Sequence, residues 1–230
     1  LNMKNPIKIV FVTLSFLLFW SCSLDLDQEN TNAPYYTFNN QDRSFMINYQ
    51  YVAGQTIPYV NQSGDTLHFR VLENQTSKNA SYSDGSLSGG EGLLENYYDS
   101  KIIQLEILEN PSTEPYALVN YIFSKNNNTL NTGINFPMWN LPLFSFIDEI
   151  QNSVNIFTNQ YQGQTTSSVS INGHQFNKVI TINANSNDSG NDDSFGPLLQ
   201  NVNEILYDYD FGIIQFKDIN DTIWRVDYPQ

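Results

Sequence analysis

The two histidines are the residues best suited to acid–base chemistry, yet their surroundings favour neither catalysis nor zinc binding. His68 stands on the polar face of an alternating segment, and His174 directly follows an Asn172-Gly173 turn. A nucleophilic triad needs a histidine positioned by an acid, and a zinc site needs three or four His, Cys or carboxylate ligands. With two histidines and one cysteine in the chain, we expect surface roles for both histidines, no zinc and no catalytic residue.

The acidic segment 183–196 partly follows the spacing of a calcium loop. The motif Asn185-x-Asn187-x-Ser189-Gly190-x-x-Asp193 resembles an EF-hand, but Asn185 stands where Asp is needed and Gly196 where a bidentate Glu belongs. The segment therefore predicts at most low-affinity calcium capture, by Asp188, Asp192 and Asp193. A solvated acidic loop is the simpler interpretation.

Other catalytic patterns are not met. None of the 24 acidic residues stands out as a pair for glycoside hydrolysis. Asp148 and Glu149 are adjacent, and adjacent residues on a helix do not face each other. The glycine-rich stretch 85–92 lacks the Gly-Lys-Ser/Thr ending of a phosphate loop. We expect a non-enzymatic protein without a cofactor.

The N-terminal segment predicts where the protein is targeted. A short basic head at 3–8 precedes the uncharged apolar run Ile9–Trp20, which is typical of a secretory signal peptide and shorter than the ~20 residues of a membrane span. The next residues, Phe19-Trp20-Ser21-Cys22, resemble the lipobox of bacterial lipoproteins, although Trp20 is bulkier than usual there. The resemblance implies lipidation of the only cysteine, Cys22, whereas an ordinary secreted protein would carry a spare thiol.

Residues 22–29 resemble the acidic export tag of surface-exposed Bacteroidota lipoproteins. We expect a signal peptide at 1–21, a lipidated polar tether at 22–40 and one domain at 41–230, held at the outer membrane on its periplasmic face or at the cell surface. Without Lys4 and Lys8, eight basic residues stand against 24 acidic ones, a formal charge of −16. That charge repels phosphate backbones, so nucleic acid is not an expected partner.

Most of the domain reads as short strands. Apolar residues alternate with polar ones at 66–72, 103–107 and 116–123, the period of strands with one buried face. Turn residues separate alternating runs at 61–65, 172–173 and 218–221, which predicts three hairpins. The fold class is therefore mainly β, an antiparallel sandwich, half-barrel or barrel. Segments 75–95, 126–135 and 183–196 read as loops, and a 3.6-residue period predicts one amphipathic helix near 141–157.

The segments Gly54–Thr66 and Tyr207-x-Tyr209-x-x-Gly212-Ile213-Ile214-x-Phe216-x-Asp218, followed by Trp224, resemble small Bacteroidota lipoproteins, a group with no established activity. Asp65-Thr66-Leu67 and Asp221-Thr222-Ile223 resemble the O-glycosylation site of exported Bacteroidota proteins, which would place sugars on Thr66 and Thr222. The same residues also suit turns that lead into strands.

These features predict a lipid-anchored envelope protein that binds a partner protein or a glycan, because tyrosine and tryptophan beside Asn and Gln suit sugar recognition. A second hypothesis is a carrier that encloses an apolar ligand or lipid under a curved sheet. A lined internal cavity would favour the carrier, and a filled core would favour the first hypothesis. A glycan-directed hydrolase is the third.

Overall fold

The computed structural model describes residues 32–83, 92–110, 117–137, 153–154, 165–183 and 202–228. The chain divides into two compact units, Leu1–Ala33 and Pro34–Gln230, and every described strand belongs to the second. Its first strand, β1 (Tyr35–Tyr36), pairs in parallel with β4 (Leu94–Ile107).

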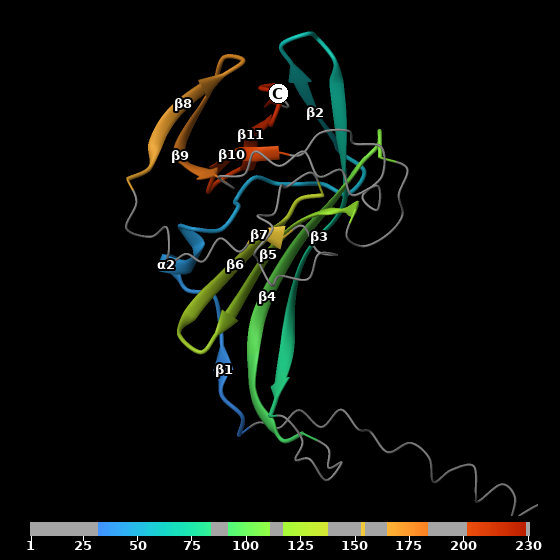
Figure 1. The fold of residues 1–230 in the computed structure, drawn as a ribbon. Helices are drawn as coiled ribbons and strands as arrows, with labels where there is room; N and C mark the ends of the chain where they lie inside the picture. The colour runs from blue at the N-terminus through green and yellow to red at the C-terminus, as the bar shows by residue number, and fades with distance from the viewer. Residues whose placement is uncertain are drawn as a thin grey trace, which may run out of the picture. The chain divides into compact units, whose positions relative to one another are not determined.

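In its described residues the second unit forms one sheet of 12 strands, which confirms the expected mainly β, antiparallel fold (Figure 1). Eleven strands lie in the order β7-β6-β5-β4-β3-β2-β12-β11-β10-β9-β8, and β1 lies off this row. The remaining elements are the short helix α2 (Asn40–Arg43) and β2 (Thr56–Asn61), β3 (Thr66–Tyr82), β5 (Val119–Asn126), β6 (Thr129–Asn135), β7 (Ser153–Val154), β8 (Ser167–Ile171), β9 (His174–Asn183), β10 (Val202–Asp208), β11 (Gly212–Asp218) and β12 (Ile223–Val226).

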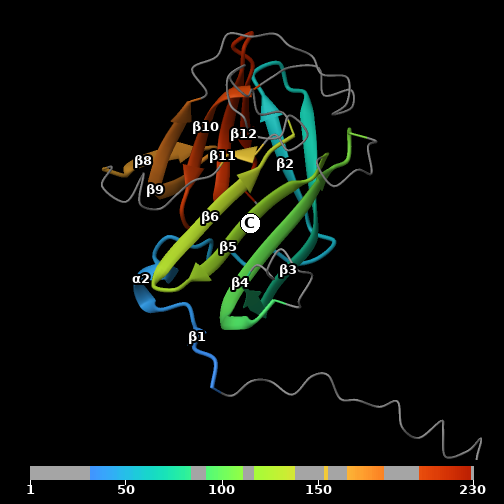
Figure 2. The same cartoon turned by 60° about the horizontal axis from the view of Figure 1, so that its bottom comes forward.

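Two sequential meanders make up the row. Strands β2 to β7 each pair with the next strand along the chain, and so do β8 to β12. The meanders join where β12 lies antiparallel to β2, with Trp224 opposite Asn61 and Val226 opposite Tyr59. In Figure 2 the green and yellow strands β4 to β6 cross in front of the red strands β10 to β12. The curled sheet therefore brings its two halves face to face.

Side chains fill the space between the two halves in the described part of the chain. Phe69 of β3 stacks on Phe216 of β11 with 6.1 Å between ring centroids, and Tyr121 of β5 lies 6.3 Å from Tyr207 of β10. The inward faces predicted from alternation are confirmed as buried: Leu67, Phe69, Val71, Ile103, Leu105, Ile107, Ala117, Val119, Tyr121 and Phe123. Packing of these side chains supplies the main stabilisation of the fold.

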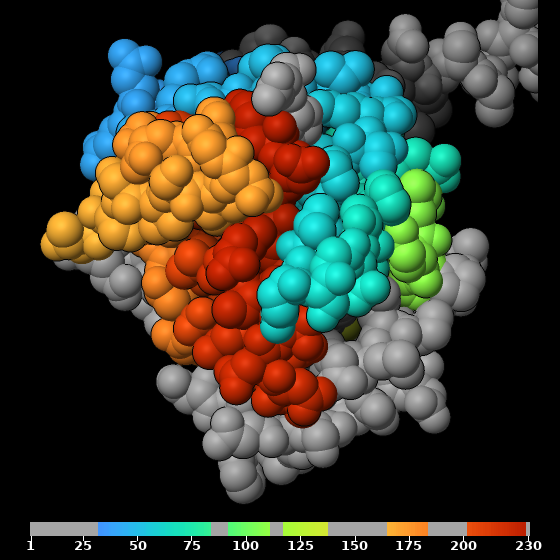
Figure 3. Space-filling model, turned by 90° about the horizontal axis from the view of Figure 1, so that it is seen from above, coloured from blue at the N-terminus to red at the C-terminus, as the bar shows by residue number. Residues whose placement is uncertain are grey.

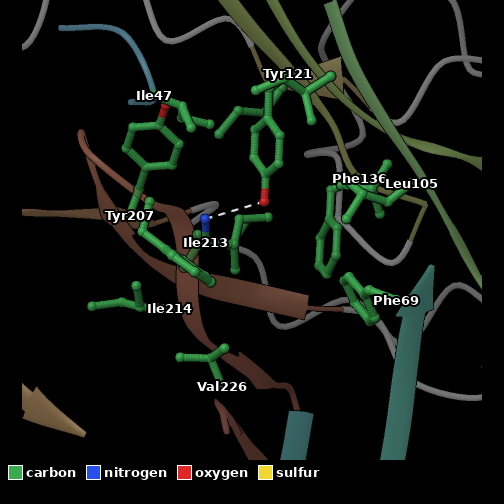
Figure 4. Close-up of a cluster of buried hydrophobic side chains, with 14 of the residues drawn as sticks. Ile47, Phe69, Leu105, Tyr121, Phe136, Tyr207, Ile213, Ile214 and Val226 are labelled. Carbon is green, nitrogen blue, oxygen red and sulfur yellow. Dashed lines mark hydrogen bonds between the residues drawn. The ribbon is translucent and has the colours of Figure 1, made fainter. Parts of the chain in front are cut away.

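Gly212 lies against Tyr121 of the opposite half of the sheet. Its φ is +107°, and a Cβ at this position would stand 2.9 Å from Cζ of Tyr121. The Tyr121 hydroxyl accepts a hydrogen bond from the backbone N–H of Ile213 at 3.2 Å (Figure 4). The Tyr59 hydroxyl donates to the carbonyl of Ile213 at 2.6 Å. Only glycine allows both this backbone conformation and this approach of the tyrosine ring.

The three hairpins predicted from turn residues are confirmed as β2–β3, β8–β9 and β11–β12. In the β8–β9 turn Asn172 has φ 48° and Gly173 has φ 84°, the positive values that a two-residue type I′ turn requires. Because β2 and β12 are neighbours, the turns of β2–β3 and β11–β12 lie side by side. Gln62 joins them, donating to the carbonyl of Asp221 at 3.1 Å and accepting from the N–H of Ile223 at 2.8 Å. Figure 3 shows the cyan β2–β3 hairpin beside the red C-terminal strands.

Two predicted loops are largely strands. Residues 75–82, expected in a loop at 75–95, continue β3 and pair with β4, and β4 begins at Leu94. Residues 129–135, expected in a loop at 126–135, form β6 and pair with β5. Residues 75–82 are polar on both faces, and in 129–135 only Leu130 and Ile134 supply large apolar side chains to the buried face, so both segments carry little hydrophobic alternation. Their backbone hydrogen bonds to a neighbouring strand determine the conformation instead.

The helix expected near 141–157 falls mostly outside the described residues. Of that segment the structure describes Ser153–Val154, which form β7 and pair with Ile134 and Asn135 of β6. A helix that runs through these two residues is therefore wrong. The edge of β6 offers backbone groups to an extended chain, and this pairing overrides the 3.6-residue period there.

Candidate functional site

A surface pocket of about 270 Å³ opens at the end of the C-terminal meander. Four separate pieces of chain line it: the segment before β2, the start of β9, the β10–β11 turn and the residues after β12. The lining residues are Asn48, Tyr49, His174, Gln175, Phe176, Asn177, Asp208, Asp210, Phe211 and Tyr228. Its size lies near the lower end of small-molecule sites, which are about 300–1,000 Å³.

The β10–β11 turn is shaped by Asp208, whose side chain is buried. One carboxylate oxygen accepts hydrogen bonds from the backbone N–H groups of Asp210 and Phe211, at 2.9 and 3.0 Å. The other accepts from the N–H of Lys178 at 3.0 Å. Both oxygens are thus engaged by backbone donors, which satisfy the buried carboxylate and fix the turn. Asp208 therefore fixes the geometry of the turn at the pocket.

Asp210 forms the polar rim. Its carboxylate pairs with Lys178 at 2.8 Å and accepts from the amide of Asn48 at 3.0 Å. Its carbonyl accepts the backbone N–H groups of Asn48 and Tyr49, which attaches the segment before β2 to the turn. The Asp210 side chain remains about one-third exposed. It can therefore accept a further hydrogen bond from a ligand hydroxyl.

Aromatic rings form the floor. Tyr228 stacks on His174, with centroids 3.5 Å apart and planes 10° from parallel. Tyr228 also contacts Phe211 at 5.3 Å and Tyr49 at 5.8 Å. Phe176 and Phe211 are buried, whereas Tyr49, His174 and Tyr228 are half-buried. Partial burial, together with Tyr49 and Asp208 nearby, raises the pKa of the Tyr228 hydroxyl, which therefore stays protonated at neutral pH.

The pocket thus combines an apolar ring floor with amide and carboxylate groups at the rim. Exposed Asn48, Gln175 and Asn177 each carry both a donor and an acceptor. This set suits a small ring with an apolar face and several hydroxyls at its edge. One lysine faces two aspartates in and beside the pocket, so the local charge disfavours an anionic ligand.

Of the residues singled out in the sequence, His174 belongs to the pocket and His68 does not. His68 lies on the outward face of β3, and its ring pairs with Glu109 at 2.6 Å. Partial burial raises the pKa of Glu109, but hydrogen bonds from the backbone and ring of His68 outweigh that effect, and the pKa lies below its ordinary value. His68 therefore has a local structural partner.

Thr66 and Thr222 are half-buried and lie at the same end of the sheet, each just after one of the two turns that Gln62 joins. Cys22, the signal segment and the calcium candidates Asp188, Asp192 and Asp193 lie outside the described residues. Within the described ranges, no three His, Cys, Asp or Glu side chains gather closely enough to hold a metal ion. In those same ranges no helix has the length and apolar character of a membrane span.

Sequence reasoning missed most of the pocket. Asp208 and Asp210 lie inside the Tyr207-x-Tyr209-x-x-Gly212 motif, and two carboxylates alternating with tyrosines before a hairpin glycine were the available signal. Asn48, Tyr49 and Tyr228 carry no such signal. Asn48 reaches the pocket through contact with Asp210, 162 residues away, and Tyr228 reaches it by packing on His174 and Tyr49 from other parts of the chain.

The chain matches no protein-family model, and no curated protein or solved structure matches it. The fold and the pocket describe an antiparallel β-protein with an aromatic-floored, polar-rimmed surface pocket.

Proposed function

We propose that this protein is a lipid-anchored envelope protein, without enzymatic activity, that binds a neutral saccharide in the pocket beside Tyr228. The observation that carries the proposal is the composition of the pocket. Tyr49 and Tyr228 offer flat apolar surface to the C–H face of a sugar ring, and Asn48, Gln175 and Asp210 offer hydrogen bonds to its hydroxyls.

The packing of the sheet supports surface recognition over carriage of an enclosed lipid. In the described residues, the space between the two meanders holds rings in mutual contact, such as Phe136 at 5.2 Å from Phe216. An apolar ligand between the layers would have to displace these side chains. The 270 Å³ pocket lies at the surface instead and has a polar rim.

The state of the two pocket aspartates supports binding over hydrolysis. A glycoside hydrolase needs one carboxylic acid to donate a proton and a second carboxylate to act as base or nucleophile. Asp208 already accepts three backbone hydrogen bonds, and Asp210 is paired with Lys178. Both carboxylates are thus already engaged by donors of the protein itself, which suits fixing the turn and accepting hydrogen bonds at the rim.

The test is isothermal titration of the full chain in a non-ionic detergent with neutral and with anionic oligosaccharides. We expect binding of a neutral oligosaccharide, and at least about tenfold weaker binding by Tyr228→Ala, because the stacking surface is lost. Tyr228→Phe keeps the ring and should bind within about threefold of wild type. Asp210→Asn should weaken binding without unfolding the turn, since the amide oxygen still faces Asn48.

Tyr82→Ala is the matched control, because Tyr82 is an exposed tyrosine on β3, far along the sheet from the pocket. The proposal fails if no neutral oligosaccharide binds. It also fails if Tyr228→Ala and Tyr82→Ala bind as wild type does, since the ligand would then be held elsewhere.

A further inference from the structure

The long hairpin of β3 and β4 has one covered edge and one open edge. On the β4 side, β1 pairs with Tyr97 and Tyr98. On the opposite side, β2 accompanies β3 only as far as Arg70, and Gly54 and Gln55 bond to Val71. Beyond Val71, no strand in the described ranges lies on that side of β3. Figure 1 shows β1, β4 and β3 in sequence across the lower part of the sheet, with β3 outermost.

The direction of the backbone groups along this edge follows from the printed bonds. Val71 directs its N–H and C=O away from β4, toward Gln55 and Gly54. The register shift between Val71 and Glu73 inserts one extra residue in β3. After it, the even-numbered residues direct their backbone N–H and C=O groups away from β4. The N–H of Ser83 donates to Leu93, across the β3–β4 hairpin, which agrees with odd residues facing β4. Asn74, Thr76 and Ala80 therefore present backbone donors and acceptors outward.

We propose that this edge pairs with the same edge of a second copy of the chain, antiparallel and two-fold symmetric about Ser77. An edge strand of this length is a ready template for another strand. The regular part of β3 runs between its two register shifts, from Glu73 to Ser81, and Ser77 is its midpoint. Pairing about that midpoint continues the sheet from one copy into the other, in the order β1-β4-β3-β3-β4-β1.

Charge is compatible with this register and disfavours two alternatives to it. Glu73 and Lys78 are the only charged residues between 72 and 83, so the edge is neutral in a chain of net charge −14. About Ser77, Glu73 faces Ser81 of the other copy and Lys78 faces Thr76. If the two-fold axis lay at Lys78, the lysines of the two copies would face each other. In a parallel, in-register arrangement Glu73 would face Glu73 and Lys78 would face Lys78 of the other copy. Like charges directly opposite destabilise a strand pair.

Lysine on an edge strand commonly prevents such pairing, but Lys78 is drawn away from the edge. Its ammonium lies 4.6 Å from the ring centroid of Tyr35 and 4.1 Å from that of Tyr97. Both tyrosines belong to the β1–β4 side of the hairpin. The charge that could repel a second copy is therefore held over the face of its own sheet.

Disulfide trapping tests the axis directly. In the full chain with Cys22→Ser, Ser77→Cys places two thiols opposite each other in a non-hydrogen-bonded pair, where Cα atoms are about 4.5 Å apart and a disulfide can form. Gln75→Cys is the matched control, because its two copies would lie about 13 Å apart, four residues along the strand. We expect a covalent dimer from Ser77→Cys under mild oxidation in detergent, and none from Gln75→Cys.

A charge exchange tests the register without a thiol. Gln75 faces Asn79 of the other copy, so Gln75→Glu/Asn79→Glu opposes like charges twice and Gln75→Lys/Asn79→Glu opposes unlike charges twice. Asn79→Glu is common to both variants, so its lost hydrogen bond to Ser100 cancels. Sedimentation velocity should give a dimer dissociation constant at least about tenfold higher for the Glu/Glu variant than for the Lys/Glu variant. Ser170→Glu/Thr181→Glu, on exposed positions of β8 and β9, controls for net charge.

The proposal is overturned if Ser77→Cys and Gln75→Cys form disulfide-linked dimers equally, or if neither does. It is overturned as well if the amides of Asn74 and Thr76 resist hydrogen exchange at dilutions where the wild type sediments as a monomer. In that case another part of the same chain covers the edge.

Discussion

Gly212 shows how one residue without a side chain sets the distance between the two halves of the sheet. Gly212→Ala should lower the free energy of unfolding by at least about 3 kcal/mol, because it adds a strained φ to a contact of 2.9 Å with Tyr121. Urea denaturation measures the change. Gly64→Ala is the control, since Gly64 has φ +91° with no atom within 4 Å of the added Cβ. It should cost only about 1–2 kcal/mol, and equal losses would contradict the role given to Tyr121.

Single residues could be predicted from the sequence only where their partners are local. The glycine of the Asn172-Gly173 turn was predictable because both residues of a type I′ turn are adjacent. The requirement for Gly212 was not, because its reason is Tyr121, which bonds the backbone 92 residues away. The pocket follows the same rule, since His174 was visible as a candidate residue and its stacking partner Tyr228 was not.

At the scale of elements, the seam between β2 and β12 holds the two meanders together. Gln62 makes hydrogen bonds to Asp221 and Ile223 from an exposed position. Gln62→Ala should therefore cost about 1 kcal/mol and accelerate hydrogen exchange at the amide of Ile223. The control is Ser63→Ala, because the N–H by which Ser63 bonds Asn61 belongs to the backbone and survives the substitution. Unchanged exchange at Ile223 in Gln62→Ala would contradict a stabilising role for this bridge.

The first part of β3, which has one wet and one buried face, was predictable, and its second part, which is polar on both faces, was not. Leu67, Phe69 and Val71 alternate with His68 and Arg70, and this part of β3 follows the expected pattern. From Gln75 to Tyr82 the same strand shows no hydrophobic alternation. This part extends past the core, and β4 is the strand with which it pairs in the described residues. Hydrophobic period reports burial, so it cannot detect a strand that leaves the core.

For the whole molecule, buried tyrosines make stability depend on alkaline pH. Burial raises the pKa of Tyr51, Tyr59, Tyr121 and Tyr207 above the ordinary value near 10.0. Above about pH 10 the unfolded chain releases these protons and the folded chain keeps them. The free energy of unfolding should therefore be unaffected by these groups below pH 10 and fall above it, by about 1.4 kcal/mol per pH unit for each tyrosine.

Urea denaturation at successive pH values, with tyrosinate absorbance as a second signal, measures this slope. Tyr121→Phe should make the decline shallower by about 1.4 kcal/mol per pH unit, because one titrating group is removed. A free energy of unfolding that stays constant up to about pH 11 would show that the unfolded chain also retains these protons.

The proposed lipid anchor is tested at Cys22. If Cys22 is acylated as the lipobox resemblance implies, Cys22→Ala should move the protein from the membrane fraction to the soluble fraction of the producing bacterium. Each buried methylene contributes about 0.8 kcal/mol, so two or three chains suffice to hold a protein at a membrane. Mass spectrometry of the wild type should find a lipid-modified cysteine at the new N-terminus. A variant that still sediments with membranes would contradict the lipid anchor.

β12 lies in the middle of the sheet order, between β2 and β11, and this position determines when the sheet can be completed. The N-terminal meander is local in sequence, but its innermost neighbour, β12, follows Gln62 by about 160 residues. A ribosome or a secretion pore that delivers the chain from its amino end releases this strand after all the others it must join. Until then the edge of β2 that pairs with β12 lacks this neighbour. We therefore expect the sheet to be completed only after β12 has been delivered.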